Sequence, residues 1–396
     1  MIIKRDVIIV GAGISGSICA AYLANSGVDV LLIDKEIFPR DKACGDLLTE
    51  GVVTHISRLN AFEELDKIGT CLRRAHLMGE NGSECIIPFE GYVAPRFELD
   101  SMLVQVAIRR GTEFRDGCRV RSLIVENSEN GPAVRGVNVR ERGVDYQIYA
   151  RQVILADGAE SLLTPELMAQ PQEVEQRFTR SGYYAGERAY FTGVNLDEYL
   201  AKGRYNAYGI FGFHRKLVNG YYWIVPSGET GVSEGYCNIG IVYDPESSGQ
   251  VTAEEIFADL IESNRRVAAL MLGAQQATPW KQGTLRDVNT AGLRYDQGFL
   301  VIGDGAGAMM PLFKDGMTAA ADTAEAAAIA INSAMRTNDF SQIEKVYEDL
   351  ITPDEKRLKM EKITVESMYD PEVPMNMIAR MTNNPTYVKR VLKDIF

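Results

Sequence analysis

Residues 2–34 read IIKRDVIIVGAGISGSICAAYLANSGVDVLLID and decide the fold class. The β-branched run up to Val10 predicts a strand that is buried on both faces. The next segment, SICAAYLANSG, predicts a helix that ends at Gly27, and VDVLLID predicts a second buried strand that ends at Asp34. Strand, helix and strand follow one another within about thirty residues, which is the order of a βαβ unit.

Three glycines between the first strand and the helix have the spacing G-x-G-x-x-G, at Gly11, Gly13 and Gly16. The first permits a tight turn, the second lets the backbone approach a pyrophosphate, and the third lets helix and strand pack closely. N–H groups at the start of the helix, where Ser15 lies, point toward the phosphates. Asp34 lies 34 − 16 = 18 residues after the last glycine, where a carboxylate accepts from a ribose hydroxyl. The stretch predicts a dinucleotide site; a glycine-rich turn in another α/β protein is the alternative.

The charge of the chain excludes some classes of function. Its 396 residues include 42 Lys and Arg against 54 Asp and Glu, so the net charge is −12. Hydrophobic residues make up 46% and charged residues 24%, as in ordinary globular proteins. An acidic chain without a basic run is not expected to bind nucleic acid or to dock on anionic lipid.

Cysteines and histidines are few and scattered. The six cysteines form no C-x-x-C pair and none of the three histidines pairs at ligand spacing, so no metal site is predicted. A chain this long needs no disulfides, which favours a reduced, cytoplasmic setting. Residues 7–28 carry no charge, but their glycines and Asn25 argue against a membrane-spanning segment, and none is predicted.

A second glycine-rich region lies near the other end of the chain. Residues 297–335 read QGFLVIGDGAGAMMPLFKDGMTAAADTAEAAAIAINSAM, which predicts a strand, a loop from Gly303 and a mostly buried helix from Gly316. No further strand ending in a carboxylate follows, so this is not a second complete βαβ unit. Asp304 is placed to hydrogen-bond a ribityl hydroxyl. The N–H groups of Gly316 and Met317 are expected to face a flavin edge, where negative charge grows on reduction.

At this point the chain resembles flavoproteins with the p-hydroxybenzoate hydroxylase-type FAD fold. GAGISG with Asp34 is similar to the first motif of that class. Asp157-Gly158, in QVILADGAESLL, is similar to the middle motif, and Gly303-Asp304 to the third. The resemblance implies that the cofactor is FAD.

The same resemblance implies two further cofactor contacts and a domain plan. PRFELDSML resembles the R-x-x-L-D segment of the class, which implies that Arg96 contacts the cofactor, and Val120 is assigned there too. The expected fold is α/β, a Rossmann-like FAD-binding domain with an inserted, mostly antiparallel β substrate domain and a helical C-terminal segment. The expected bounds are 1–90, 96–165 and 286–335 for the FAD-binding domain, 170–285 for the substrate domain and 336–396 for the C-terminal segment.

Within this class the chain resembles the geranylgeranyl reductase family. PRDKACGDLLTEG, residues 39–51, is similar to its P-x-x-K-x-C-G segment, which implies that Cys44 and Gly45 lie by the flavin. GYYWIVPSGETGVSEGYCNIGIV is similar to its G-Y-x-W-x-F-P block, which implies substrate contacts at Tyr221, Trp223 and Pro226.

Three positions depart from that family's pattern. Val225 stands where the family has Phe before the Pro, and Leu47 where it has a small residue. Lys314-Asp315 replaces the G-E of the flavin-edge segment, which places a cation near the reduced flavin. A solvated loop position is the alternative reading of Lys314.

The resemblance implies an FAD-dependent oxidoreductase that reduces C=C double bonds of a hydrophobic, prenyl-like or polyene substrate by hydride from flavin N5. An external donor, NADPH or ferredoxin-type, would supply electrons, and Cys44, Asp46 or water would supply the proton. Two alternatives stay open: an FAD-dependent monooxygenase acting on a natural product, and a flavin-scaffolded cyclase without redox turnover.

Overall fold

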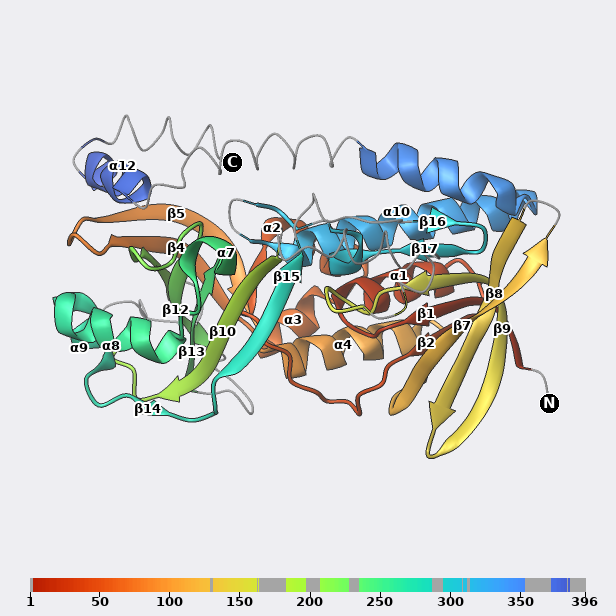
Figure 1. The fold of residues 1–396 in the computed structure, drawn as a ribbon, viewed down its shortest axis with the longest axis horizontal. Coiled ribbons are helices and arrows are strands. Elements are labelled where there is room, and N and C mark those ends of the chain that lie inside the picture. Colours follow the sequence, from red (N-terminus) through yellow and green to blue (C-terminus); the bar gives the residue numbers. More distant parts are fainter. Residues whose placement is uncertain are drawn as a thin grey trace.

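The protein contains two β-sheets that lie side by side, with helices packed on both (Figure 1). The computed structural model describes residues 3–128, 131–161, 163, 183–196, 207–227, 235–286, 295–307, 309–311, 314–352, 372–382 and 384. The start of the expected substrate domain, 170–182, lies outside these ranges, as does most of the expected C-terminal segment after residue 352.

The first sheet is built on the predicted βαβ unit, and its strand order is β16-β17-β9-β1-β2-β6. β1 pairs in parallel with β2 and with β9, and β9 pairs in parallel with β17. A hairpin of β7 and β8 joins the first half of β9 in antiparallel fashion. The strands are β1 (Ile3–Val10), β2 (Val30–Ile33), β6 (Glu113–Arg115), β7 (Cys118–Ser128), β8 (Gly131–Glu141), β9 (Val144–Leu155), β16 (Tyr295–Asp296) and β17 (Phe299–Val301).

Both faces of β1 are buried, which explains its continuous apolar run. Val7 and Ile9 pack toward the helices α1 (Ile14–Ala24), α4 (Arg96–Arg109) and α10 (Gly316–Thr337). Ile8 and Val10 pack on the opposite face, against the β7–β8 hairpin. The alternation of side chains along a strand therefore places one hydrophobic cluster on each side of this sheet.

The second sheet has the strand order β14-β10-β13-β12-β11-β4-β5-β3, with β15 paired to β10. Its pairings are antiparallel except for β4 and β11, which run parallel. The strands are β3 (Leu47–Thr49), β4 (Thr70–Gly79), β5 (Glu84–Val93), β10 (Tyr183–Thr192), β11 (Ala207–Phe213), β12 (Tyr221–Ser227), β13 (Tyr236–Tyr243), β14 (Gln275–Gln276) and β15 (Lys281–Arg286).

Three strands of this sheet come from a range expected in the FAD-binding domain. We placed residues 1–90 there, but β3, β4 and β5 extend the second sheet through the pairing of β4 with β11. The partner of a strand is set by tertiary packing more than by its own residues, because an apolar alternation fits either sheet. The chain therefore enters the second sheet earlier than expected.

Helices pack on both faces of the second sheet, and the face that carries α12 also faces the cavity. α8 (Ala253–Ser263) and α9 (Arg265–Met271) pack on Tyr222 and Ile224. At the other end, α12 (Glu372–Thr382) lies over β4 and β5, where Ile378 is buried (Figure 1). The remaining described helices are α2 (Glu50–Arg58), α3 (Phe62–Ile68), α7 (Pro245–Ser248), η3 (Gly303–Ala306) and η4 (Phe340–Gln342), and residues 343–352 are helical too.

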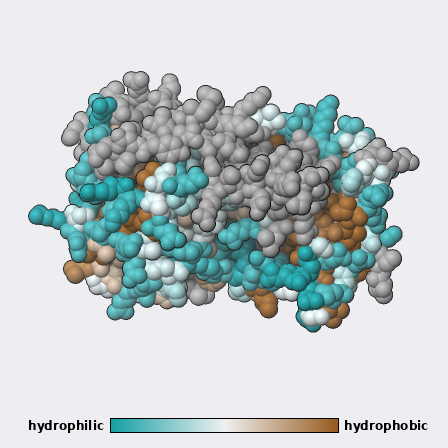
Figure 2. Space-filling view, viewed as in Figure 1, coloured by the Kyte–Doolittle hydropathy of each residue, from teal (hydrophilic) through white to brown (hydrophobic). Residues whose placement is uncertain are grey.

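Among the described residues that Figure 2 shows, most are hydrophilic, and the hydrophobic ones gather in patches. Among the described helices, none is both long and apolar enough to cross a membrane.

Candidate FAD and substrate site

One cavity of about 1320 Å³ runs from the carboxyl ends of β1 and β2 to the helix α12. Cavities that hold one drug-sized ligand measure about 300–1,000 Å³, so this volume exceeds the need of a single small molecule. Its lining changes along its length, from glycines and charged side chains at the first sheet to aromatic and aliphatic side chains at the second.

The first glycine of the motif makes the turn that opens the cavity. Gly11 has φ +102°, and a Cβ there would lie 2.3 Å from the Ala156 carbonyl oxygen. A Cβ on Gly16 would lie 1.8 Å from the Gly11 carbonyl oxygen. Gly11 lines the cavity, whereas Gly16 serves the packing of α1 against this turn.

Gly13 is the N-cap of α1, and no side chain caps the helix there. The N–H groups of the first turn therefore face the cavity, beside Ser15. Guanidinium nitrogens of Arg40 and Arg96 lie 3.6 and 3.9 Å from the position of a Cβ on Gly13. A helix N-terminus next to two guanidinium groups fits the pyrophosphate of FAD.

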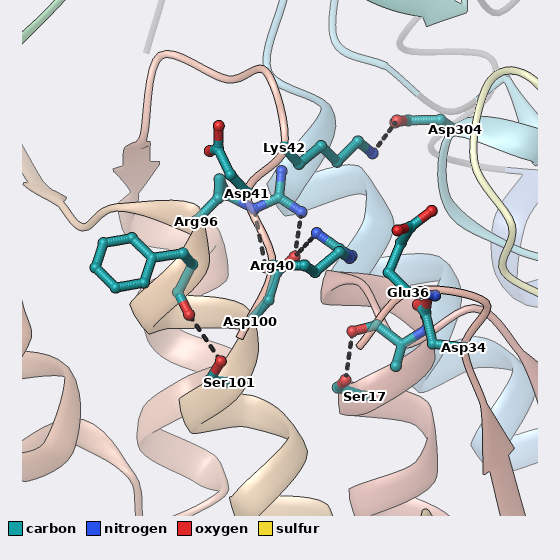
Figure 3. A network of polar contacts seen from close by, with 12 residues as sticks. Ser17, Asp34, Glu36, Arg40, Asp41, Lys42, Arg96, Asp100, Ser101 and Asp304 are labelled. Carbon is teal, nitrogen blue, oxygen red and sulfur yellow. Dashed lines mark hydrogen bonds and ion pairs between the residues drawn. The ribbon is translucent and has the colours of Figure 1, made fainter. Parts of the chain in front are cut away.

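A buried carboxylate holds both guanidinium groups in place (Figure 3). Asp100 lies one turn after Arg96 on α4 and accepts two hydrogen bonds of 2.8 Å from the Arg96 guanidinium. It also forms an ion pair with Arg40, at 2.8 Å. Burial alone would raise the pKa of Asp100, but the charges of Arg96 and Arg40 keep it below its usual range. The sequence pointed to Arg96, whereas Arg40 and Asp100 were missed.

Asp34 and Val120 both line the cavity near its opening at the first sheet. The two carboxylate oxygens of Asp34 accept from the backbone N–H groups of Ala12, at 2.8 Å, and Glu36, at 2.9 Å. A carboxylate oxygen accepts more than one hydrogen bond, so this fixed carboxylate fits a ribose hydroxyl as well.

The middle and third motifs meet on the other side of the cavity. Asp157 accepts from the Ser161 hydroxyl at 2.7 Å, while its Oδ1 is buried without a hydrogen-bond partner among the described residues. Burial raises the pKa of Asp157. Lys42 lies 3.7 Å from the carboxylate of Asp304 and next to Gly158 (Figure 3). An unpartnered buried oxygen at this wall fits a hydroxyl group of a bound cofactor.

The start of α10 differs in one respect from expectation. Gly316 and Met317 line the cavity, but the Met317 N–H donates to the side chain of Asp315 at 2.9 Å. Asp315 is the N-cap residue and also accepts from Thr318. The Met317 N–H is thus already engaged, contrary to the expectation that it faces the flavin edge. Gly303 does not line the cavity; its backbone N–H donates to Thr323.

Strand alternation decides which residues of β12 reach the cavity. Tyr221, Trp223 and Val225 line it, together with Cys44 and Gly45 of the loop opposite. Pro226 is not among the described residues that line it, because it has the opposite parity to Tyr221 and Trp223 on the strand. The spacing of the family motif did not separate the two faces, so the expectation for Pro226 was wrong in this respect.

Behind this loop lies a buried polar network centred on Asp46. One carboxylate oxygen of Asp46 accepts from the Tyr190 hydroxyl at 2.5 Å and from the Asn238 amide at 2.7 Å. Asn238 also donates to the Cys44 carbonyl at 2.9 Å and accepts from the Trp223 indole at 2.8 Å. Burial raises the pKa of Asp46 to about 6, against the opposing charge of a nearby arginine. The network ties the Cys44–Gly45 loop to the cavity wall of the second sheet.

Comparisons with known proteins agree with this geometry. A family described as FAD binding domain matches residues 4–349. The chain belongs to this FAD-binding family.

Several proteins similar to this chain are named as reductases. The chain is 29% identical to a menaquinone reductase of Mycolicibacterium smegmatis, over 82% of this chain and 76% of the relative. It is 26% identical to a digeranylgeranylglycerophospholipid reductase of Methanosarcina acetivorans, over 87% and 79%. A geranylgeranyl bacteriochlorophyll reductase-like structure from Thermoplasma acidophilum has the same fold, with a TM-score of 0.81, 21% identity and complete coverage of both chains.

The expected fold class, the FAD cofactor and the resemblance to the geranylgeranyl reductase family are confirmed. This FAD-dependent oxidoreductase is similar to reductases of the geranylgeranyl type. Within the described ranges, no group of three His, Cys, Asp or Glu side chains is placed to hold a metal ion.

The far end of the cavity in this FAD-binding protein was not foreseen. Phe89 of β5 and Phe211 of β11 line it, and Met377 and Met381 of α12 close it. Phe89 was missed because the strand that carries it was expected in the FAD-binding domain. The apolar alternation of residues 84–93 was the available signal, but it does not say which cavity the strand faces.

Proposed function

We propose that this FAD-dependent oxidoreductase reduces carbon–carbon double bonds of a hydrophobic, prenyl-like or polyene lipid. The observation that carries the proposal is the continuity of the cavity. It reaches from the expected pyrophosphate site at Gly13 to an aromatic and aliphatic end lined by Phe211 and Met377. The names of the relatives, menaquinone reductase and digeranylgeranylglycerophospholipid reductase, support a lipid-like substrate. Bound FAD, once reduced, would supply hydride.

The residues of the chain would bind and orient the lipid and provide a proton. Aromatic side chains at Tyr221, Trp223 and Phe211 give the wall a wide apolar contact surface that excludes water from the reacting end. Burial raises the pKa of the Cys44 thiol and of the Tyr221 hydroxyl, so both carry a proton at neutral pH. Both line the cavity, whereas Asp46 is fully buried and does not. We therefore assign proton donation to Cys44 or Tyr221 in preference to Asp46.

An anaerobic assay tests this function. The FAD-loaded protein is reduced and mixed with a geranylgeranyl lipid or a menaquinone, and products are analysed by mass spectrometry. Gain of two hydrogen atoms per reduced double bond is expected. Unchanged alkenes across the panel, with oxygen-dependent hydroxylation in air, would favour the monooxygenase alternative instead.

The proposal also includes an external electron donor and a cytoplasmic location. NADPH and a ferredoxin-type protein are the two donors to compare, by the rate at which each bleaches the flavin absorbance without oxygen. All six cysteines are free thiols, which supports a reducing, cytoplasmic compartment.

A further inference from the structure

Four elements enclose the end of the cavity that lies away from the nucleotide motif. β4, β5 and β11 are neighbours in the second sheet, and α12 lies over β4 and β5 (Figure 1). We call this part of the cavity the α12 chamber. Its lining residues on these four elements are apolar: Ala75, Leu77, Ile87, Phe89, Phe211, Phe213, Pro374, Met377 and Met381.

The charged side chains of the cavity belong to other segments. Among the described residues of β4, β5, β11 and α12 that line it, none is charged. His214, directly after β11, lines the cavity too, but burial lowers its pKa, so it is neutral at neutral pH. Lys314, before α10, is 7% exposed and donates to the Pro311 carbonyl at 2.6 Å, so the alternative of a solvated loop position is wrong. Burying a charged head group in the α12 chamber would be costly, whereas a hydrocarbon end is favoured there.

A row of side chains on one face of the second sheet connects the α12 chamber with the Cys44–Gly45 loop. A Cβ on Gly45 would lie 3.4 Å from the Trp223 ring. Trp223 of β12 is paired with Phe211 of β11, which is paired with Leu77 of β4. Leu77 is paired in turn with Cys85 of β5. Directly paired residues share a face, and strands lie about 4.8 Å apart, so the row spans about 14 Å from Trp223 to β5.

Two methionines one turn apart on α12 close this row at β4 and β5. Met381 is 3% exposed and belongs to one hydrophobic cluster with Ala75 and Ile87. Met377 packs against the same cluster and is partly buried. Thioether side chains are flexible and fill irregular gaps, so they form an apolar end wall that adapts to the end of a hydrocarbon chain.

We propose that the hydrocarbon terminus of the lipid enters the α12 chamber and ends against Met377 and Met381. The inference rests on the proposed function and deepens it. The double bond beside the Cys44–Gly45 loop is then selected by its distance from the hydrocarbon terminus, and not by its distance from the head group. Met377 and Met381 are therefore specificity-determining residues.

Equilibrium binding tests the chamber without relying on turnover. Three ligands are compared: geranylgeraniol, an analogue with a phenyl group on the hydrocarbon terminus, and the phenyl ether of the head-group oxygen. Their dissociation constants are measured by calorimetry on the oxidised, FAD-loaded protein. We expect the terminal-phenyl analogue to bind at least about tenfold more weakly than geranylgeraniol, because extra volume at a closed apolar site forces side chains aside. The phenyl ether should bind within about threefold of geranylgeraniol.

Three variants make the result specific. Met377→Ala enlarges the α12 chamber and should reduce the tenfold penalty of the terminal-phenyl analogue to about threefold or less. Met381→Ala enlarges it from the next turn of α12 and decides the question if Met377→Ala does not fold with bound FAD. Met271→Ala is the matched control and should keep the penalty, because Met271 of α9 packs on the opposite face of this sheet and does not line the cavity.

Product mapping gives a second readout. Farnesol, geranylgeraniol and geranylfarnesol have the same head group, and each is one isoprene unit longer than the one before. Each is allowed one turnover with the reduced protein, and tandem mass spectrometry locates the saturated unit. Counted from the hydrocarbon terminus, its position should be the same in all three products. A position that is constant when counted from the hydroxyl group, or that is random, would overturn the inference.

The outcomes separate the chamber from the proposed function. If the prenols are reduced but the terminal-phenyl analogue carries no penalty, or if both alanine variants on α12 retain the penalty, the inference is refuted and the function stands. If the penalty is present and is relieved by these variants but no isoprenoid is reduced, the function fails and the chamber stands as a binding site for a hydrocarbon terminus.

Discussion

Asp46 offers a direct test of the buried network behind the Cys44–Gly45 loop. We predict that the free energy of unfolding of Asp46→Asn, compared with that of wild type, increases as the pH rises. Asparagine has the same shape and tolerates the left-handed backbone at this position, where φ is +60°. Its amide oxygen can still accept from Tyr190 and Asn238. The substitution therefore removes the ionisation of the side chain, and its other effects do not depend on pH.

The magnitude follows from the pKa of Asp46, which burial raises from the ordinary value of 3.8 to about 6. A carboxyl with a raised pKa disfavours folding once it is ionised, so its effect is absent below about pH 4 and complete above about pH 6. At 1.36 kcal/mol for each pKa unit, the ionised group lowers the free energy of unfolding by about 3 kcal/mol at pH 7 and by about 1–2 kcal/mol at pH 5. Relative to wild type, the variant should gain about 1–2 kcal/mol between these two pH values.

Urea unfolding of the FAD-loaded protein at pH 5, 6 and 7 measures this difference. The new amide nitrogen would take the place of Oδ1, which is buried without a partner among the described residues, at a cost of about 1–3 kcal/mol that does not depend on pH. The slope of the difference against pH, and not its absolute value, is therefore the diagnostic quantity. Asp145→Asn is the control, because Asp145 pairs with Arg140 on the surface, and its removal should give a small difference that is the same at each of these pH values. A flat difference for Asp46→Asn as well would refute the reasoning.

Three further predictions concern the rest of the cavity. Asp100→Asn leaves the buried Arg96 and the partly buried Arg40 without their carboxylate and should lower the free energy of unfolding by about 3–5 kcal/mol in urea titrations; a loss below about 1 kcal/mol would contradict a stabilising role of these ion pairs. Gly11→Ala should abolish bound flavin absorbance, since its Cβ would lie 2.3 Å from a carbonyl oxygen, whereas Gly27→Ala, at φ +82° with open space around it, should keep the flavin. Cys44→Ser should slow product formation by about 10²-fold or more if the thiol donates the proton, with flavin reduction by the electron donor unchanged; an unaltered rate would assign the proton to another group.

Local sequence was sufficient for the nucleotide half of the site. The βαβ unit, the turn at Gly11 and the helix N-terminus at Gly13 follow from residue types and spacing within one short segment. Asp34 and Asp157, which the motifs predict as cofactor-binding residues, both line the cavity because they follow strands of the first sheet. In a parallel sheet, the carboxyl ends of neighbouring strands open onto the same crevice.

The substrate half depended on pairings between distant segments. Nothing local to residues 70–93 indicated that β4 would pair with β11 and bring Phe89 into the cavity. The exclusion of Pro226 followed from the parity of one strand, and the contact of Lys314 with Asn219 joins loops 314 − 219 = 95 residues apart.

The amino-acid sequence by itself determined that this chain binds a dinucleotide, because the glycine spacing and the helix that follows act over a few turns of backbone. Only the tertiary structure decided which side chains line the substrate half of the cavity. Strand pairing and side-chain burial there depend on contacts that close long loops, and the free energy of such contacts is not encoded in any single segment.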